Sequence, residues 1–255
     1  MKILIKSLIL VTLQISLQAQ THNEQYQDIV INNVIVSHGV RECASRYEAL
    51  KNILNKYKRP ITMLDIGASQ GYFSFRTAHD YDAICIMIEC DYNSEWHISD
   101  QLLTLCQNNT DLEKILFLKQ HLSPEDLEQL AACEHFDVVL AFNVIHHFGK
   151  QWERVAKAIL SLGDNIVFEN PPPEDKIAGK SGYPKLIEQF LLANNGKVIL
   201  EIPRHTDPKT KGKMVWCEKS KSQLSSPYWF VKPNNIFKDA YLIKSTYTAI
   251  LWTVF

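Results

Sequence analysis

The chain alternates short, almost continuous apolar runs with segments in which apolar residues recur every three or four positions. The runs are typical of strands buried on both faces, and the periodic segments are typical of amphipathic helices that cover such strands. Together they predict a parallel sheet with helices on both faces. The first expected strands cover residues 61–67, 83–89, 114–118, 136–144 and 164–170.

The expected helices have recognisable ends. Ser94 and Ser123 are expected to act as N-caps, and Pro124 after the second of them favours a helix start. Gly163 and Gly196 are expected to close two later helices. The expected helices cover residues 40–57, 71–81, 94–109, 123–134, 151–163 and 182–196.

The last two apolar runs break this rhythm. Residues 197–203 and 213–219 are joined by a polar loop, which predicts an antiparallel hairpin at the sheet edge. The aromatic, strand-prone residues that follow predict a C-terminal β-rich extension packed on the domain. The predicted fold class is therefore α/β: a Rossmann-like, doubly wound, mostly parallel seven-stranded sheet with an antiparallel edge hairpin and that extension.

The N-terminus has a different pattern. Lys2 and Lys6 flank the start of an apolar run over residues 7–17, and Ala19 follows. This pattern is typical of a secretory signal peptide, and the run is too short for a stable transmembrane span, which needs roughly 20 residues. The segment therefore favours export or membrane targeting. The expected organisation is a signal-like segment at residues 1–19, a helical lead-in at 20–60, the α/β domain at 61–218 and the extension at 219–255.

Composition narrows the picture further. Hydrophobic residues make up 46% of the chain and charged residues 22%, as in a globular protein with a sizeable core. The formal net charge of −1 provides no overall field toward nucleic acid or an anionic membrane. The six cysteines include no CxxC pair and no Cys/His cluster, so we expect reduced, structural thiols and no metal site.

The stretch LDIGASQGYF, residues 64–73, joins the first strand to a helix and is the main candidate for ligand binding. Gly67 permits a tight turn, and the small Ala68 and Ser69 let the backbone approach a ligand. Gly71 permits close packing as the helix begins. A carboxylate inside the preceding strand, Asp65, is unusual for a buried strand and asks for a specific role.

The spacing of these residues separates two nucleotide families. The dinucleotide fingerprint requires glycine at the position of Tyr72, and its first strand is usually apolar up to the turn. Both features argue against a nicotinamide oxidoreductase. LDIGASQGYFSF instead resembles the first motif of the class I S-adenosylmethionine-dependent methyltransferases, with Asp65 two residues before Gly67 and Ser69 in place of the middle glycine. By order and spacing the resemblance extends over roughly residues 40–218.

This resemblance implies S-adenosylmethionine as cofactor and assigns roles to several residues. Gly67, Ala68, Ser69 and Gly71 would form the loop beneath the cofactor, with Asp65 organising it. An acid that ends the second strand would bind both ribose hydroxyls.

Glu89 holds that position, 24 residues after Asp65, and Asp91 is the alternative. Near Gln120 and His121 the family's acid beside the adenine is missing, so adenine recognition must come from elsewhere. Asn143 would lie beside the methionine part of the cofactor.

The reaction centre of an open α/β sheet lies beyond the carboxyl ends of its strands. This places Asn143, His146, His147, Glu169 and Asn170 near the transferred methyl group. One of the two adjacent histidines is a candidate general base, because imidazole titrates near neutral pH; a packed or capping histidine is the alternative. The prolines after Asn170 are interpreted as a rigid loop beside the acceptor or as simple loop stiffening.

Two basic groups are candidates for binding an anion. Arg41 and Arg46 are either partners for the cofactor's carboxylate or surface charges. The loop between the last two strands either receives a phosphate or carboxylate of the acceptor or is a solvated tip; its basic residues are Arg204, His205, Lys209, Lys211 and Lys213.

The sequence thus predicts a methyltransferase that transfers a methyl group from S-adenosylmethionine to an acceptor, with a small-molecule or saccharide oxygen favoured. A non-catalytic binding protein that keeps the cofactor pocket is the alternative, and export favours it because the cofactor is made in the cytosol. Nucleic acid stays open as a partner through the basic loop alone. The oligomeric state is not indicated.

Overall fold

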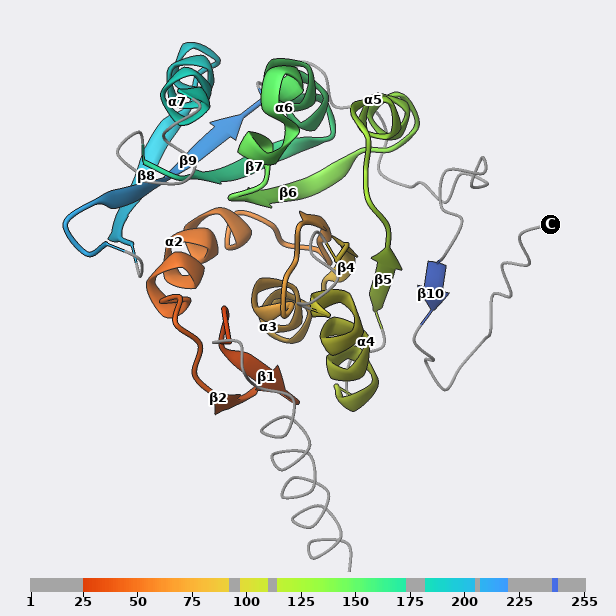
Figure 1. Cartoon of the computed structure of the whole chain (residues 1–255). Coiled ribbons are helices and arrows are strands. Elements are labelled where there is room, and N and C mark those ends of the chain that lie inside the picture. The colour runs from red at the N-terminus through yellow and green to blue at the C-terminus, as the bar shows by residue number, and fades with distance from the viewer. Residues whose placement is uncertain are drawn as a thin grey trace, which may run out of the picture.

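A single twisted sheet organises the molecule (Figure 1). The structure, a computed structural model, describes residues 25–91, 97–109, 114–172, 182–204, 207–219 and 240–242. The sheet has eight strands in the order β10-β5-β4-β3-β6-β7-β9-β8. The strands are β3 (Thr62–Ile66), β4 (Ile84–Glu89), β5 (Ile115–Lys119), β6 (Phe136–Phe142), β7 (Gly163–Asn170), β8 (Lys197–Pro203), β9 (Lys211–Glu218) and β10 (Ala240–Leu242).

Strand directions confirm the predicted fold class. Strands β5, β4, β3, β6 and β7 are parallel neighbours, and β8 and β9 form the antiparallel hairpin beside β7. Strand β10 adds an eighth member, antiparallel to β5 at the opposite edge. The central β6 is buried at every position, which explains why its sequence is apolar at every position except Asp137 rather than alternating.

Helices cover both faces of the sheet, and each face has its own hydrophobic core. Figure 1 shows α2, α3 and α4 on one side and α5, α6 and α7 on the other. The helices are α2 (Ala44–Leu54), α3 (Tyr72–Tyr81), α4 (Ile98–Asn108), α5 (Pro124–Cys133), α6 (Trp152–Ser161) and α7 (Tyr183–Ala193), with a 3₁₀ segment η1 (Ile145–Gln151) before α6. Because the five central strands are parallel, their carboxyl ends lie at one common edge of the sheet, where open α/β sheets bind their ligands.

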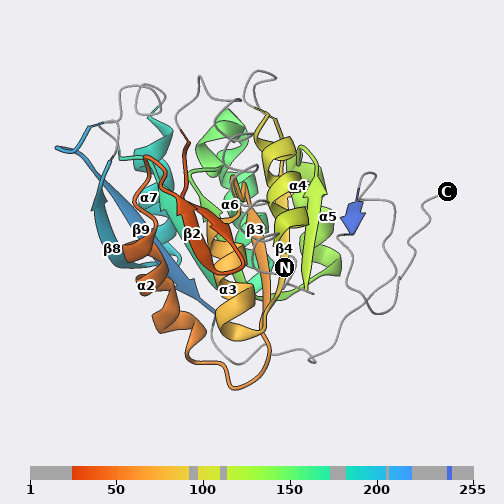
Figure 2. The same ribbon diagram turned by 90° about the horizontal axis from the view of Figure 1, so that it is seen from below.

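The N-terminal part of the described chain contains a β-hairpin that the sequence analysis did not predict. Strands β1 (Ile29–Ile31) and β2 (Val34–Ser37) pair antiparallel across the two residues Asn32 and Asn33, whose φ values are 47° and 62°. Two consecutive positive φ values are what a type I′ hairpin turn requires, and asparagine tolerates them. Figure 2 shows this hairpin on the same face as α3. The expected helical lead-in is therefore wrong for residues 29–37.

One of the predicted helix ends is confirmed, and another is wrong. Helix α5 has the expected cap at Ser123, completed by a capping box with Asp126. Gly163 does not end α6 but begins β7, where a side chain would meet the carbonyl oxygen of Phe136 at 2.8 Å. Ser94, the expected cap of α4, and the signal-like segment lie outside the described residues. No helix in the described part of the chain is long and apolar enough to cross a membrane.

Candidate functional site

The turn between β3 and α3 has a left-handed backbone at three positions. Gly67, Ser69 and Gly71 have φ values of 73°, 56° and 75°, a left-handed conformation that favours glycine. A Cβ at Gly67 would lie 2.6 Å from Cγ2 of Val144, so the turn sits directly against the end of β6. Ala68 is fully buried. The turn is therefore tight and left-handed, with glycine at two of its three left-handed positions.

Glu89 lies beside this turn, at the last position of β4. Its Oε2 accepts a hydrogen bond from the backbone N–H of Ser69 at 2.7 Å, and its Oε1 accepts one from Cys90 N–H at 2.8 Å. Burial raises the pKa of Glu89 to about 7, although these two hydrogen bonds act in the opposite direction. Each carboxylate oxygen keeps a further lone pair for a ligand hydroxyl.

The alternative acid, Asp91, has a different task. Its two oxygens accept from the backbone N–H and the hydroxyl of Ser99, at 2.9 and 2.5 Å, and it pairs with Lys119 at 3.3 Å. Asp91 thus holds the first turn of α4 against the end of β5. This arrangement favours Glu89 over Asp91 as the acid that faces a ligand at the turn.

Asp65 supports the turn from below. The side chain is 2% exposed, and its Oδ2 accepts a hydrogen bond from the hydroxyl of Ser74 in α3 at 2.7 Å. Burial raises the pKa of Asp65 to about 6. The carboxylate therefore ties β3 to the helix that follows the turn, which explains how an acid is accommodated inside a buried strand.

A segment near the N-terminus also contacts the turn, and no local pattern in the sequence indicated this. The backbone N–H of Gln27 donates to Oε1 of Gln70 at 3.0 Å, and Oε1 of Gln27 accepts from Tyr72 N–H at 3.2 Å. Both glutamines are buried. Residues 25–28 thus form one wall beside the glycine turn.

At the end of β6, Asn143 connects the turn to the next strand. Asn143 has a φ of 58°, directly follows Phe142 and precedes Val144, which contacts the turn. Its Nδ2 donates to Oε1 of Glu169 at 3.3 Å, and its Oδ1 accepts from Nη1 of Arg204 at 3.2 Å. Asn143 therefore stands between the expected cofactor position and a second group of charged residues.

Glu169 is the centre of that charged group. It is 4% exposed and lies at the end of β7. Arg41 donates to it through Nη2, and Arg46 donates through Nε at 2.7 Å and Nη2 at 3.0 Å. Burial alone would raise the pKa of Glu169, but the two guanidinium groups outweigh it and hold this pKa at about 2. Glu169 is therefore ionised near neutral pH.

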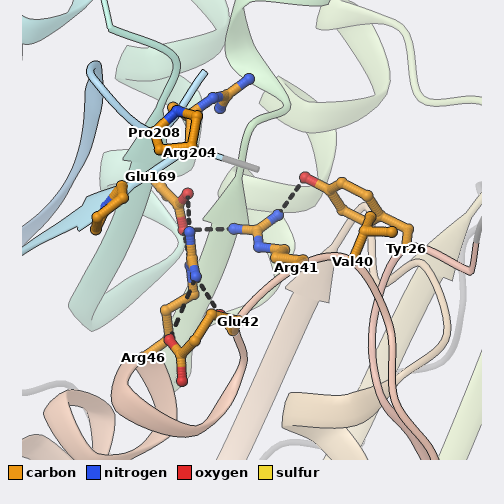
Figure 3. A pocket seen from close by; sticks show the side chains of 9 residues that line it. Tyr26, Val40, Arg41, Glu42, Arg46, Glu169, Arg204 and Pro208 are labelled. Carbon is orange, nitrogen blue, oxygen red and sulfur yellow. Dashed lines mark hydrogen bonds and ion pairs between the residues drawn. The ribbon is translucent and has the colours of Figure 1, made fainter. Parts of the chain in front are cut away.

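Arg41 and Arg46 are consequently not surface charges. Each is only 3% exposed. Arg41 also donates through Nη1 to the hydroxyl of Tyr26 at 2.6 Å, and its guanidinium lies 5.1 Å from the ring centre of that residue. Figure 3 shows Arg41 and Arg46 converging on Glu169. No local sequence pattern indicates this network, because Arg41 and Glu169 are 128 positions apart in the chain.

These residues line a pocket, which we call the arginine pocket. In the view of Figure 3, Glu169 lies between Arg46 on one side and Arg204 and Pro208 on the other. Its lining includes Tyr26, Arg41, Glu42, Arg46, Glu169 and Arg204. The pocket combines side chains from the start of α2, the end of β7 and the loop after β8, all at the edge of the sheet where the parallel strands end.

The two histidines lie outside this lining. His146 and His147 belong to η1, with ring centres 4.0 Å apart, and His147 is exposed. Neither is among the residues that line the arginine pocket in the described chain. Asn170 is buried and donates from Nδ2 to the carbonyl of Pro184 at 2.8 Å, which fixes the start of α7. The expected set near the methyl group is therefore brought together only in part.

Among the described basic residues of the predicted loop, Arg204 alone lines the pocket. Lys213 instead pairs with Glu188 of α7 at 2.6 Å. Lys209 and Lys211 are exposed, and His205 lies outside the described residues. Near the expected adenine position, the backbone N–H of Gln120 donates to the carbonyl of Glu89 at 3.0 Å. In the described part of this loop, the tip is exposed to solvent, and Arg204 is the candidate for binding an anion.

The order of the seven strands β3 to β9, with three helices on each face, is the Rossmann-like fold of methyltransferases. Comparison with solved structures agrees with it. The bifunctional kinase-methyltransferase WbdD matches with a TM-score of 0.63 and 21% identity over 78% of this chain and 45% of its own. The chain thus spans a little less than half of WbdD.

A second neighbour matches over nearly its whole length. The N-terminal domain of EvdMO1, solved with SAH bound, has a TM-score of 0.54 and 11% identity over 82% of this chain and 96% of its own. No family model matches the chain, and no curated protein matches it by sequence. At these identities the comparisons establish the fold of the chain.

Proposed function

We propose that this protein is a methyltransferase that uses S-adenosylmethionine as its methyl donor. The observation that carries the proposal is the position of Glu89, whose carboxylate is pinned beside the left-handed glycine turn by the Ser69 N–H. A carboxylate at the end of the second strand of an α/β unit suits bidentate binding of a ribose. The fold and the SAH-bound EvdMO1 neighbour support the same reading.

The residues of the chain fit such a cofactor. The turn of Gly67 to Gly71, with glycine at both ends, would lie beneath its nucleoside. Glu89 would accept from its ribose hydroxyls, and Asn143 would lie toward its methionine part. When bound, the cofactor supplies a methyl group that is already activated. The protein then needs mainly to hold an acceptor in line with that group and to exclude water. The edge beyond β6 and β7 is where the acceptor would be held.

The test is calorimetric titration of the chain with S-adenosylmethionine, its demethylated product SAH and NAD. We expect the first two to bind and NAD not to bind. Glu89→Ala should weaken SAH binding at least tenfold, because each of two lost hydrogen bonds to a charged group is worth about 1.5 to 3 kcal/mol. Glu153→Ala, on the surface of α6, is the control and should leave the Kd unchanged.

Failure of both cofactor forms to bind would refute the proposal. Binding of both without methyl transfer to any offered acceptor would instead support the second candidate, a binding protein that has kept the cofactor pocket. The expected acceptor is a small molecule that is methylated on oxygen. The arginine pocket narrows this class further.

A further inference from the structure

We propose that the arginine pocket is the acceptor site and that it binds an acceptor through an anionic oxygen, of a carboxylate or a phosphate, which is itself the atom that becomes methylated. The inference rests on the proposed function, since it assumes a methyl donor at the glycine turn. We infer that the anion bound by Arg204 belongs to the acceptor and is not the cofactor's own carboxylate.

The first support is position. The pocket begins where Asn143 hydrogen-bonds both Glu169 and Arg204. Asn143 adjoins Val144, whose side chain packs against the glycine turn. A donor lying on that turn with its methionine part toward Asn143 would therefore present its methyl group to the pocket. A pocket at the carboxyl end of β7 is also at the edge where open α/β sheets bind their substrates.

The second support is charge. Among the described residues, three guanidinium groups line the pocket, those of Arg41, Arg46 and Arg204. Glu169 already binds Arg41 and Arg46 on both of its oxygens. Arg41 and Arg46 are almost fully buried, whereas Arg204 lines the same pocket and is partly exposed. Arg204 is therefore the cation best placed to receive a ligand anion.

A buried hydrogen-bond donor of Arg41 also supports anion binding in the pocket. The Nε–H of Arg41 is buried and has no hydrogen-bond partner within the described chain, although its two terminal nitrogens are engaged by Tyr26 and Glu169. A buried donor without a partner is costly, and a ligand oxygen in the pocket would relieve that cost. Tyr26 and Glu169 meanwhile hold the guanidinium plane of Arg41 in place, as preorganised binding requires.

The third support is the missing base. An alcohol or an ammonium group must lose a proton before or during methyl transfer, and a side chain must accept it. Glu169 is committed to two arginines and stays ionised, so it does not serve as that base near neutral pH. The described lining contains no histidine, and Glu42 is half-exposed and accepts from Ser45 N–H at 2.9 Å. The pocket therefore suits an oxygen that arrives already deprotonated.

The reaction is balanced without a proton transfer. A lone pair of the anionic acceptor oxygen forms a bond to the methyl carbon while the carbon–sulfur bond breaks. The bonding electrons pass to sulfur, so the sulfonium becomes a neutral thioether and the acceptor anion becomes a neutral methyl ester or a phosphate diester with one charge fewer. Arg204 and Arg41 hold the acceptor oxygen in line, and Glu169 is a positioning residue that fixes Arg41.

The experiment compares Arg204→Gln with Lys211→Gln, an exposed cation on the same hairpin. Binding of inorganic phosphate and of acetate is measured on the SAH-saturated chain, and SAH binding is measured separately. We expect one of the anions to bind, with affinity at least tenfold lower in Arg204→Gln and unchanged in Lys211→Gln. SAH affinity should stay within twofold in both variants. Preference for phosphate or for acetate then identifies which anion the acceptor carries.

Three outcomes would overturn the inference. SAH binding with no phosphate or acetate binding shows that the pocket takes no anion. A loss of SAH affinity in Arg204→Gln, with the affinity of methylthioadenosine unchanged, assigns the pocket to the cofactor's carboxylate, because methylthioadenosine lacks it. Anion binding without SAH binding removes the proposed function itself. Should Arg204→Gln not fold, Arg204→Lys keeps the charge, loses the guanidinium fork and should show the same selective loss.

Discussion

Glu169 shows how a single buried side chain can serve a site without reacting in it. Its charge is neutralised by Arg41 and Arg46, and all three are almost fully buried. Such pairs add little net stability when compared with apolar residues, but removing one partner leaves an uncompensated charge in the interior. The network thus holds two arginines at fixed positions along one side of the pocket.

Glu169→Gln tests this arrangement. We expect the free energy of unfolding to fall by about 3 to 5 kcal/mol, because two buried guanidinium groups lose their counterion. Urea unfolding followed by circular dichroism measures it. Glu128→Gln removes a carboxylate from an exposed pair with Arg154 and should leave stability nearly unchanged. Equal effects of the two substitutions would contradict a structural role for Glu169.

Glu89 predicts a pH dependence of cofactor binding. Ribose hydroxyls donate to a carboxylate, so the ionised form of Glu89 binds them and the protonated form does not bind them both. With a pKa of about 7, affinity for SAH should rise as pH rises, by about tenfold between pH 6 and pH 8. Titration calorimetry at several pH values measures this. Glu89→Gln should bind weakly with a flat profile, and an equally steep profile in that variant would assign the titration to another group.

Substituting two glycines that share one backbone conformation distinguishes the stability cost of local strain from that of close packing. Gly67 and Gly182 both have a φ of 73°, yet a Cβ at Gly67 would meet Val144 at 2.6 Å and one at Gly182 would meet nothing within 4 Å. Gly182→Ala should cost about 1 to 2 kcal/mol from backbone strain alone. Gly67→Ala should cost more and should also abolish SAH binding. Equal losses of stability, measured by thermal unfolding, would mean that Val144 moves aside.

The secondary structure elements were predictable where the hydrophobic pattern is long enough. Strands β3 to β9 follow the apolar runs, and the cap at Ser123 follows from local chemistry. Strands β1 and β2 have three and four residues, too few for a period to emerge, so the hairpin was missed. Within the candidate site, the left-handed turn at Gly67 and Gly71 was predictable because its spacing is local. The pairing of Arg41 with Glu169 depends on tertiary structure and leaves no local signal.

The whole domain should have its greatest stability in mildly acidic solution. Glu169 has a pKa lowered from 4.5 to about 2, so its contribution is present above pH 4.5 and is lost as pH falls toward 2. Asp65 and Glu89 have raised pKa values of about 6 and about 7. Their contributions are present at low pH and are lost as pH rises through those values. Because these losses begin at the ordinary pKa values of 3.8 and 4.5, we expect the free energy of unfolding to peak at about pH 4 to 4.5.

Urea unfolding between pH 3 and pH 9 measures this profile. Glu89→Gln should flatten its alkaline side, because a neutral side chain no longer has to ionise in a buried position. Glu169→Gln should flatten its acidic side. A stability that climbs steadily to pH 8 in the unmodified chain would contradict the assignment of raised pKa values to Asp65 and Glu89.

The separation of 128 positions between Arg41 and Glu169 also has a consequence in time. At a synthesis rate of about 5 to 20 residues per second, roughly 6 to 25 seconds pass between the appearance of the arginine and that of its partner. During that interval Arg41 has no counterion from β7. Arg204 appears later still. The pocket is therefore among the last parts of the domain to be assembled, and its completion marks a chain whose sheet is already in place.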